Sequence, residues 1–272
     1  MAKMLVVSLL LFAGFAQASD FAAVETKLKA AMEADIRTES EVERDRNRSP
    51  VETLEFFGLR DDMKVIELLP GGGWYTKLLA PVMADNSELY VALGTGRVKE
   101  RVLNQDGFEN VIVVAEDAKI YRPEGSRFYA LELDTLEVTD ADIVFTFRNY
   151  HNFAAEGRAA MNRAVYDALK PGGTYAVVDH NRRHMESDNN ENHMPPVVVD
   201  YNRRHMESDN NENRRRVDPV LAIREIEAAG FEFVDFTDLH FRPDDELRYE
   251  VGRKTVTGNT DRWTLKFRKP AR

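Results

Sequence analysis

Hydrophobic residues change their spacing from one segment of the chain to the next. Short runs rich in Val, Ile and Leu are typical of buried strands, and they occur at residues 65–68, 89–93, 111–115, 142–147 and 175–179. Helical spacing predicts helices between these runs, near residues 74–83, 98–104 and 154–169. Strands that alternate with helices predict a parallel sheet covered by helices on both faces.

The same reading extends to both ends of the chain. Apolar residues at helical spacing predict an amphipathic helix at residues 20–37, and Asp218 and Pro219 open a helix that Gly230 ends. Two further strands are predicted at residues 231–236 and 263–268, and their connection has no helical pattern. We therefore expect these two strands to add an antiparallel pair at one edge of the sheet.

The first 18 residues have the pattern of a secretory signal peptide. Lys3 precedes an apolar run at residues 4–15, and Ala16 to Ala18 match a small-x-small cleavage site. The run is too short for a permanent membrane anchor. The sequence thus predicts export to the periplasm or beyond, a helical extension at residues 19–48, and one main domain at residues 49–272.

Composition narrows the classes of partner and chemistry. The chain has 37 basic and 47 acidic residues, a net charge of −10, which argues against nucleic acid or an anionic membrane surface as partner. It has no cysteine, which excludes disulfides, a thiolate nucleophile and a Cys–zinc site. The six histidines are not spaced as a metal site, so no metal is predicted.

The most informative segment is a strand, a glycine turn and a helix start at residues 64–76. Gly71, Gly72 and Gly73 allow a sharp turn and a close approach to a ligand. The acid Glu67 in the preceding strand can accept hydrogen bonds from a ribose or an ammonium group. A purely structural turn remains an alternative. The dinucleotide fingerprint needs a third glycine and a later acid, and both are absent.

The order of acid and glycines carries a family resemblance. Glu67, Leu69, Gly71 and Gly73 resemble the acid-x-Gly-x-Gly-x-Gly motif of class I S-adenosylmethionine-dependent methyltransferases, with Leu69 in place of the first glycine. The Lys-Pro-Gly-Gly turn that ends at Gly173 also resembles that family. The chain looks most like a little-characterised group of predicted methyltransferases with signal peptides. Segments 48–52, 68–73, 149–151, 178–180, 216–219, 258–262 and 267–270 carry this likeness.

The resemblance implies a fold, a cofactor and its contacts. The fold is a Rossmann-like, doubly wound, seven-stranded and mostly parallel sheet, and the cofactor is S-adenosylmethionine. Thr95 stands where the family places an acid for the ribose, and losing that bond costs about 1.5–3 kcal/mol. The implied cofactor contacts are Glu67, Pro70, Gly71, Gly72, Gly73, Thr95, Glu116, Asp117, Ala118, Arg148 and Asn149.

Methyl transfer often needs a base beside the nucleophile. His151 is the first candidate and His180 the second, because both follow strands at the edge where open α/β sheets bind ligands. Asn149 and Tyr150 are predicted to position the substrate or to stack on the cofactor. Either histidine could instead cap a helix or support a neighbouring residue. The leading hypothesis is an exported methyltransferase for a small-molecule acceptor. The alternative is an exported, non-catalytic ligand-binding protein that keeps the fold.

One segment occurs twice. Residues 177–192 recur at 198–213, an offset of 21, with His180 replaced by Tyr201. This pattern indicates a tandem duplication or a sequence-assembly error. The first copy is assigned to the central strand, and the second is predicted outside the sheet or at an edge. Asp188, Asn190 and Asn192 have calcium-loop spacing, but His193 and Val199 break the EF-hand pattern.

Overall fold

The computed structural model describes residues 13–85, 87–182, 215–247 and 249–271. Within them one sheet has the strand order β3-β2-β1-β6-β7-β9-β8. Its strands are β1 (Lys64–Leu68), β2 (Glu88–Ala92), β3 (Val111–Val114), β6 (Ala141–Phe147), β7 (Leu169–His180), β8 (Glu232–Thr237) and β9 (Arg262–Arg268).

The direction of the strands confirms the fold class. From β3 to β7 all neighbours are parallel, whereas β9 pairs antiparallel with both β7 and β8. The sheet is therefore mostly parallel and closes with the predicted antiparallel pair. The strand order reverses beside β1, and open α/β sheets bind ligands at such a point, beyond the carboxyl ends of the strands.

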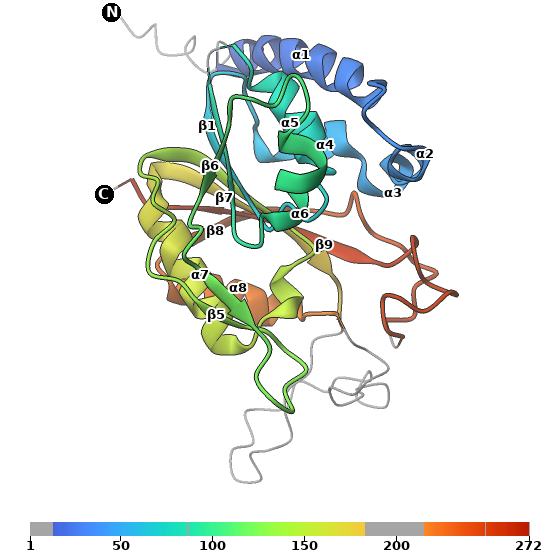
Figure 1. Ribbon diagram of the computed structural model, residues 1–272, viewed down its shortest axis with the longest axis vertical. Coiled ribbons are helices and arrows are strands. Elements are labelled where there is room, and N and C mark those ends of the chain that lie inside the picture. The colour runs from blue at the N-terminus through green and yellow to red at the C-terminus, as the bar shows by residue number, and fades with distance from the viewer. Residues whose placement is uncertain (1–12, 86, 183–214, 248, 272) are drawn as a thin grey trace, which may run out of the picture.

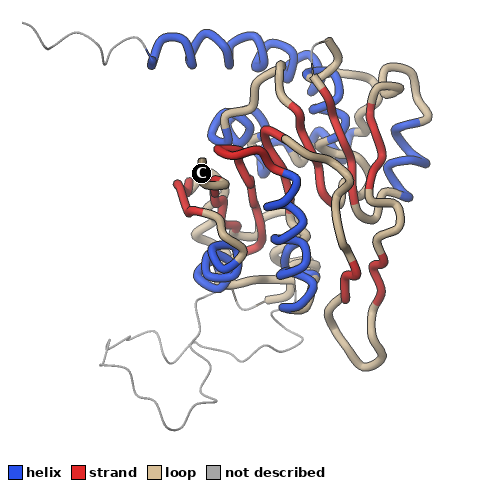
Figure 2. The backbone as a smooth tube through the Cα atoms, turned by 90° about the vertical axis from the view of Figure 1, so that its left-hand side faces the viewer, coloured by secondary structure: helices blue, strands red, loops and turns tan. Residues whose placement is uncertain are grey.

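Helices cover both faces of the sheet (Figures 1 and 2). Val65 and Ile143 pack on the side of α1, α4 and α5, whereas Ile66 and Val144 pack on the side of α7 and α8. This alternation is the two-residue period of strands buried on both faces. The helices are α1 (Ala13–Met32), α2 (Glu39–Val42), α3 (Asp45–Arg48), α4 (Pro50–Phe57), α5 (Thr76–Val82), α6 (Gly96–Val98), α7 (Ala155–Ala168) and α8 (Pro219–Ala228), with the π-helix η1 (Lys99–Leu103) and the 3₁₀-helix η2 (Tyr150–Asn152).

Some elements differ from the sequence prediction. The helix expected at 98–104 is a short α-helical turn followed by the π-helix η1. β7 begins earlier than expected, with an irregularity: Ala141 pairs with Leu169 but Ile143 with Thr174. Gly172, at φ 81°, helps the chain accommodate the extra residues. The small sheet of β4 (Lys119–Tyr121) and β5 (Ala130–Glu132) was not predicted, because strands so short and partly exposed carry no clear apolar pattern.

Helix α1 continues through the predicted signal cleavage site. Its buried residues Val24, Leu28 and Ala31 lie after that site, so cleavage behind Ala18 would leave their packing in place. The signal peptide stays a prediction, since residues 1–12 lie outside the described residues. No described helix combines the length and the apolar character needed to cross a membrane.

The first copy of the repeated segment forms part of β7. Val177 and Val178 pair with β6 on one side and β9 on the other, which confirms their assignment to the central strand. The second copy falls outside the described residues. The chain on either side of that gap is joined: Asn181 forms a bridge with Val217, and the Val217 amide donates to the His180 carbonyl at 3.0 Å.

Candidate functional site

The first residue after each of four parallel strands has a left-handed backbone. These residues are Leu69 (φ 53°), Leu93 (φ 65°), Ala115 (φ 53°) and Arg148 (φ 60°), behind β1, β2, β3 and β6. Each costs on the order of 1–3 kcal/mol, because a side chain crowds the backbone in this region. Such strain gathers at functional sites, so it directs attention to this edge of the sheet.

Two glycines of the turn after β1, Gly71 and Gly73, are needed for different structural reasons. Gly71 has φ 61°, and a Cβ built there would make only an ordinary contact, 3.8 Å from a guanidinium nitrogen of Arg97. Gly73 has φ 83°, and a Cβ there would lie 2.6 Å from Cγ2 of Val102 and 3.0 Å from Cγ2 of Val98. Gly71 therefore leaves room for a ligand, whereas Gly73 lets the turn pack against α6 and η1.

Replacing Gly73 with alanine is expected to destabilise the protein by about 2–4 kcal/mol, because backbone strain and a clash with Val102 add. Gly107→Ala is the matched control: Gly107 has φ 89° but no atom within 4 Å of its Cβ position, so it carries the strain alone. Urea unfolding of both variants measures the difference. Equal losses would contradict the packing role of Gly73.

Glu67 is buried beneath the glycine turn, with 2% of its surface exposed. Oγ1 of Thr76, the first residue of α5, donates to Glu67 Oε2 at 2.6 Å. Burial raises the pKa of Glu67 from 4.5 to about 7, although the Thr76 hydrogen bond and the charge of Arg48 oppose the shift. The carboxylate thus lacks a full counter-charge and would gain from a cationic ligand group.

Two adjoining cavities open at this edge. The glycine-loop cavity has about 680 Å³ and lies beside Glu67, Pro70, Gly71 and Gly72. The histidine cavity has about 650 Å³ and contains His151 and His180 in its wall. Residues of the shared wall line both cavities: Leu69, Gly71, Arg97, Arg148 and Asn149. A ligand that crosses this wall could contact the glycine turn and the histidines together.

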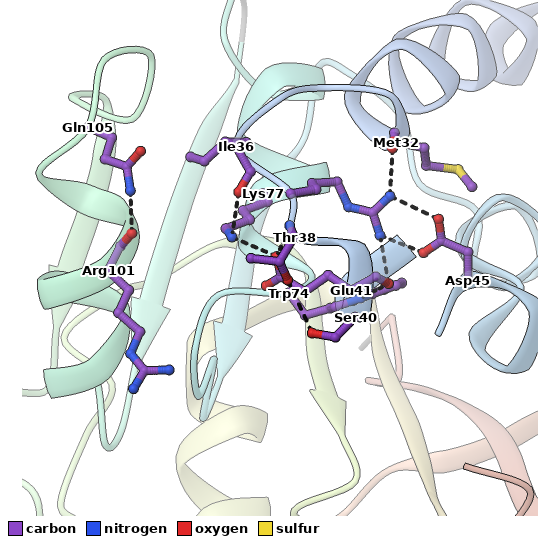
Figure 3. Close-up of polar contacts among 11 residues, drawn as sticks. Met32, Ile36, Thr38, Ser40, Glu41, Asp45, Trp74, Lys77, Arg101 and Gln105 are labelled. Atoms are coloured by element: carbon purple, nitrogen blue, oxygen red, sulfur yellow. Dashed lines mark hydrogen bonds and ion pairs between the residues drawn. The ribbon is translucent and has the colours of Figure 1, made fainter. Parts of the chain in front are cut away.

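The N-terminal extension forms one wall of the glycine-loop cavity. Lys77 Nζ pairs with Glu41 at 2.8 Å and donates to the Ile36 carbonyl at 2.9 Å, and Trp74 Nε1 donates to the Glu41 carbonyl at 2.9 Å. Figure 3 shows this network. The figure also draws Arg101 and Gln105, which lie away from the network on the opposite wall of the cavity. These contacts fix residues 36–48 against α5, so the extension belongs to the site.

His151 and Asp179 form a buried pair. Asp179 Oδ1 lies 2.5 Å from His151 Nδ1, and Asp179 Oδ2 accepts the His151 backbone amide at 2.9 Å. A carboxylate beside Nδ1 fixes the tautomer with the proton on that nitrogen. Within the described residues no group hydrogen-bonds to His151 Nε2, so this nitrogen is left to accept a proton in the histidine cavity.

His180 lies next to this pair, with ring centroids 5.6 Å apart. Its Nδ1 is 2.9 Å from Thr260 Oγ1, and its backbone amide donates to Asp179 Oδ1 at 2.6 Å. Burial, followed by the charge of Arg262, holds the pKa of His180 well below its usual range. His180 therefore stays neutral near pH 7 and positions Asp179 rather than adding a positive charge.

Three buried or partly buried arginines surround the aromatic stack of Tyr75 and Phe147, whose centroids are 3.6 Å apart. They are Arg48, Arg148 and Arg262, and neither Arg48 nor Arg148 forms an ion pair with a described residue. The guanidinium of Arg48 lies 4.1 Å from the Trp74 ring centroid. Burial lowers the pKa of Arg262 to about 9, so it remains charged at neutral pH.

Several residues assigned by resemblance lie elsewhere. Tyr150 is fully buried, donates to Glu225 at 2.9 Å and accepts from Asn162 at 2.9 Å, so it lines neither cavity and is held in the core. Asp117 and Ala118 line a third cavity of about 510 Å³. Glu116 pairs with Lys99, and Thr95 is buried outside the cavities; Gly94 faces the histidine cavity instead.

Asn149 has a role in the shape of the wall. Its Nδ2 donates to the carbonyls of Leu69 and Phe147 at 3.1 and 3.0 Å, which ties the β6 end to the β1 end. Sequence reasoning did not single out Arg48, Arg97 or Asp179 as site residues. The signal for Asp179 was its place beside His180, whereas Arg97 and Arg48 reach the site from helices α6 and α3.

Neither a known family model nor a curated protein sequence matches the chain. Solved structures are similar in fold. A SAM-dependent methyltransferase from Aquifex aeolicus aligns with a TM-score of 0.53 and 14% identity, over 90% of this chain and 98% of its own. The CcbJ methyltransferase from Streptomyces caelestis aligns with a TM-score of 0.50 and 16% identity, over 84% and 90%.

The [4+2]-cyclase SpnF aligns equally well, with a TM-score of 0.50 and 15% identity, over 94% of this chain and 96% of its own. The chain therefore has the Rossmann-like fold of class I S-adenosylmethionine-dependent methyltransferases. SpnF illustrates that one fold can host another reaction, so the activity must be argued from the site.

Proposed function

We propose that this protein is an S-adenosylmethionine-dependent methyltransferase that acts on a small-molecule acceptor. The observation that carries the proposal is the His151–Asp179 pair in a cavity that shares a wall with the glycine turn. A base and a cofactor cradle on either side of one wall are two parts that methyl transfer often uses. Export is a further part of the proposal and rests on the signal-like residues 1–18.

The residues present fit the cofactor at its amino-acid end. The buried Glu67, with its raised pKa, would pair with the ammonium group. Arg97 lies over Gly71 and would pair with a carboxylate. Gly94, at the β2 end, lines the histidine cavity beside Leu69 and Ile120. The β2 end offers no carboxylate for a ribose, so affinity rests more on the other contacts.

The cofactor supplies a methyl group made electrophilic by its attachment to a sulfonium. Asp179 holds His151 with Nδ1 protonated, so His151 Nε2 would be free to take the proton from an acceptor nucleophile placed in the histidine cavity. His180 stays neutral and adds no charge that would oppose protonation of His151. The apolar side chains of the buried Phe153 and the partly buried Leu69 in this wall reduce the water that could compete as acceptor.

The test is calorimetric titration of the protein with S-adenosylmethionine and S-adenosylhomocysteine. We expect micromolar binding of both, on the order of −8 kcal/mol. Gly71→Ala should weaken binding roughly tenfold because its Cβ enters the shared wall, whereas Gly107→Ala, with comparable backbone strain, should not. No binding at millimolar ligand by folded protein would refute the methyltransferase and favour a non-catalytic binding protein.

A further inference from the structure

The histidine cavity has the opposite charge to the protein around it. Its wall includes Arg97, Arg122, Arg127, Arg148 and Arg215, and it contains no acidic residue from the described part of the chain. The whole chain has 47 acidic and only 37 basic residues. Arg215 pairs with Glu250 at 3.5 Å, outside the cavity wall, but no described acid lines the cavity itself. Like charges repel one another, so the gathering of arginines in one cavity indicates an anionic ligand.

Arg148 is the central member of this set. It belongs to the shared wall beside Asn149, has the strained φ of 60°, and its buried Nε has no hydrogen-bond partner among the described residues. Burial lowers the pKa of its guanidinium, and the charge of Arg44 lowers it further. No described residue forms an ion pair or a hydrogen bond with the terminal guanidinium nitrogens of Arg148, and an oxyanion in the cavity is the group that would satisfy them.

Aromatic rings form another part of the same wall. The guanidinium of Arg122 lies 4.5 Å from the centroid of Tyr129, and the Tyr129 and Phe153 centroids are 6.3 Å apart. Phe153 is only 1% exposed. Tyr129 is therefore the partly exposed ring of this wall, with Phe153 packed behind it, and an aromatic body of a ligand could pack against Tyr129.

We propose that the acceptor is an oxyanion on a flat apolar body, an aromatic carboxylate or an aryl phosphate. Arg148 and Arg122 bind the oxyanion, the partly exposed ring of Tyr129 packs against the body, and the nucleophile is placed toward His151. Only the placing of the nucleophile toward His151 rests on the proposed methyltransferase function. The anion site itself stands on the arginines and can be tested without turnover.

The experiment titrates the full chain with benzoate, phenyl phosphate and the neutral benzamide, with and without saturating S-adenosylhomocysteine. The variants are Arg148→Gln and Arg122→Gln, and the matched control is Arg163→Gln, an exposed arginine of α7. Circular dichroism checks that each is folded. Arg122 is exposed, so its variant keeps the test valid if Arg148→Gln fails to fold.

We expect one of the two anions to bind at least roughly tenfold more tightly than benzamide. Which anion does so shows whether the site prefers a carboxylate or a phosphate. Arg148→Gln and Arg122→Gln should each weaken that anion roughly tenfold, and Arg163→Gln by less than about twofold. Equal binding of anion and benzamide, or equal effects of all three variants, would overturn the proposal.

S-adenosylhomocysteine separates two sources of anion binding. Benzoate or phenyl phosphate that still binds beside it supports an acceptor site, whereas loss of anion binding means that the arginines serve the carboxylate of the cofactor and overturns the proposal. Anion binding by a protein that does not bind S-adenosylmethionine would refute the methyltransferase and leave the anion site in place. Binding of S-adenosylmethionine without binding of either anion would refute only the proposal of an anionic acceptor.

Discussion

Replacing Asp179 with asparagine is expected to lower kcat by roughly 10²–10⁴-fold with the acceptor that the protein methylates. Asp179 is fully buried and accepts from the His151 ring at 2.5 Å and from two backbone amides. An asparagine carries no charge to stabilise the protonated ring, and its amide group can turn a donor toward Nδ1. His151 would then present its protonated nitrogen to the acceptor.

The control for this prediction is Asp167→Asn, an exposed acid of α7. Steady-state kinetics should show unchanged kcat for the control, and calorimetry should show that Asp179→Asn keeps its affinity for S-adenosylmethionine. His151→Asn should cost about as much as Asp179→Asn, and the double variant little more, because the two residues act as one unit. If kcat of Asp179→Asn lay within a few-fold of the wild-type value, the His151–Asp179 pair would not act as the catalytic base.

Glu67→Gln is expected to make the protein more stable at pH 8 by about 2–3 kcal/mol and to leave stability at pH 4 nearly unchanged. Burial raises the pKa of Glu67 from 4.5 to about 7. A raised folded-state pKa favours the folded protein below pH 4.5, and this contribution is lost as pH rises through about 7. A neutral glutamine has no such loss and can still accept the Thr76 hydrogen bond.

Urea unfolding at pH 4, 6 and 8 measures this effect, with Glu100→Gln, an exposed residue of η1, as control. The same Glu67→Gln variant should bind S-adenosylmethionine roughly 10- to 100-fold more weakly at pH 8, because it lacks the charge for the ligand ammonium. Wild-type affinity should rise between pH 6 and pH 8 as Glu67 ionises. Parallel pH profiles for wild type and Glu67→Gln would show that burial does not shift this pKa.

The sheet could be predicted because its strands carry their own signal. The strands are buried on both faces, as Val65, Ile66, Val144 and Val177 illustrate. They therefore form runs of Val and Ile that can be recognised in the sequence of each strand by itself. The cofactor contacts at the end of β1 could be predicted for a similar reason, because they belong to one continuous segment with a recognisable glycine turn. The β4–β5 pair is short and partly exposed, so packing rather than pattern decides it.

The site beyond the glycine turn depends on tertiary placement. Asp117 follows β3 as expected, but the chain turns at Ala115 and brings Asp117 to a cavity that it shares with Glu132. Tyr150 and His151 are neighbours in sequence, yet one points into the core and the other into the cavity. The arginines come from distant segments, and a sequence in which acids outnumber bases gives no hint that they converge.

The joined ends behind β7 have a consequence for the history of the chain. Asn181 and Val217 hold the two sides together, so the register of β7 and the start of α8 do not depend on how many residues lie between them. Each doubling of the number of residues between two joined ends costs only about 0.6 kcal/mol of closure entropy. If the repeat is a tandem duplication, it would therefore be nearly neutral to selection, and its second copy could diverge while the sheet and the His151–Asp179 pair are inherited unchanged.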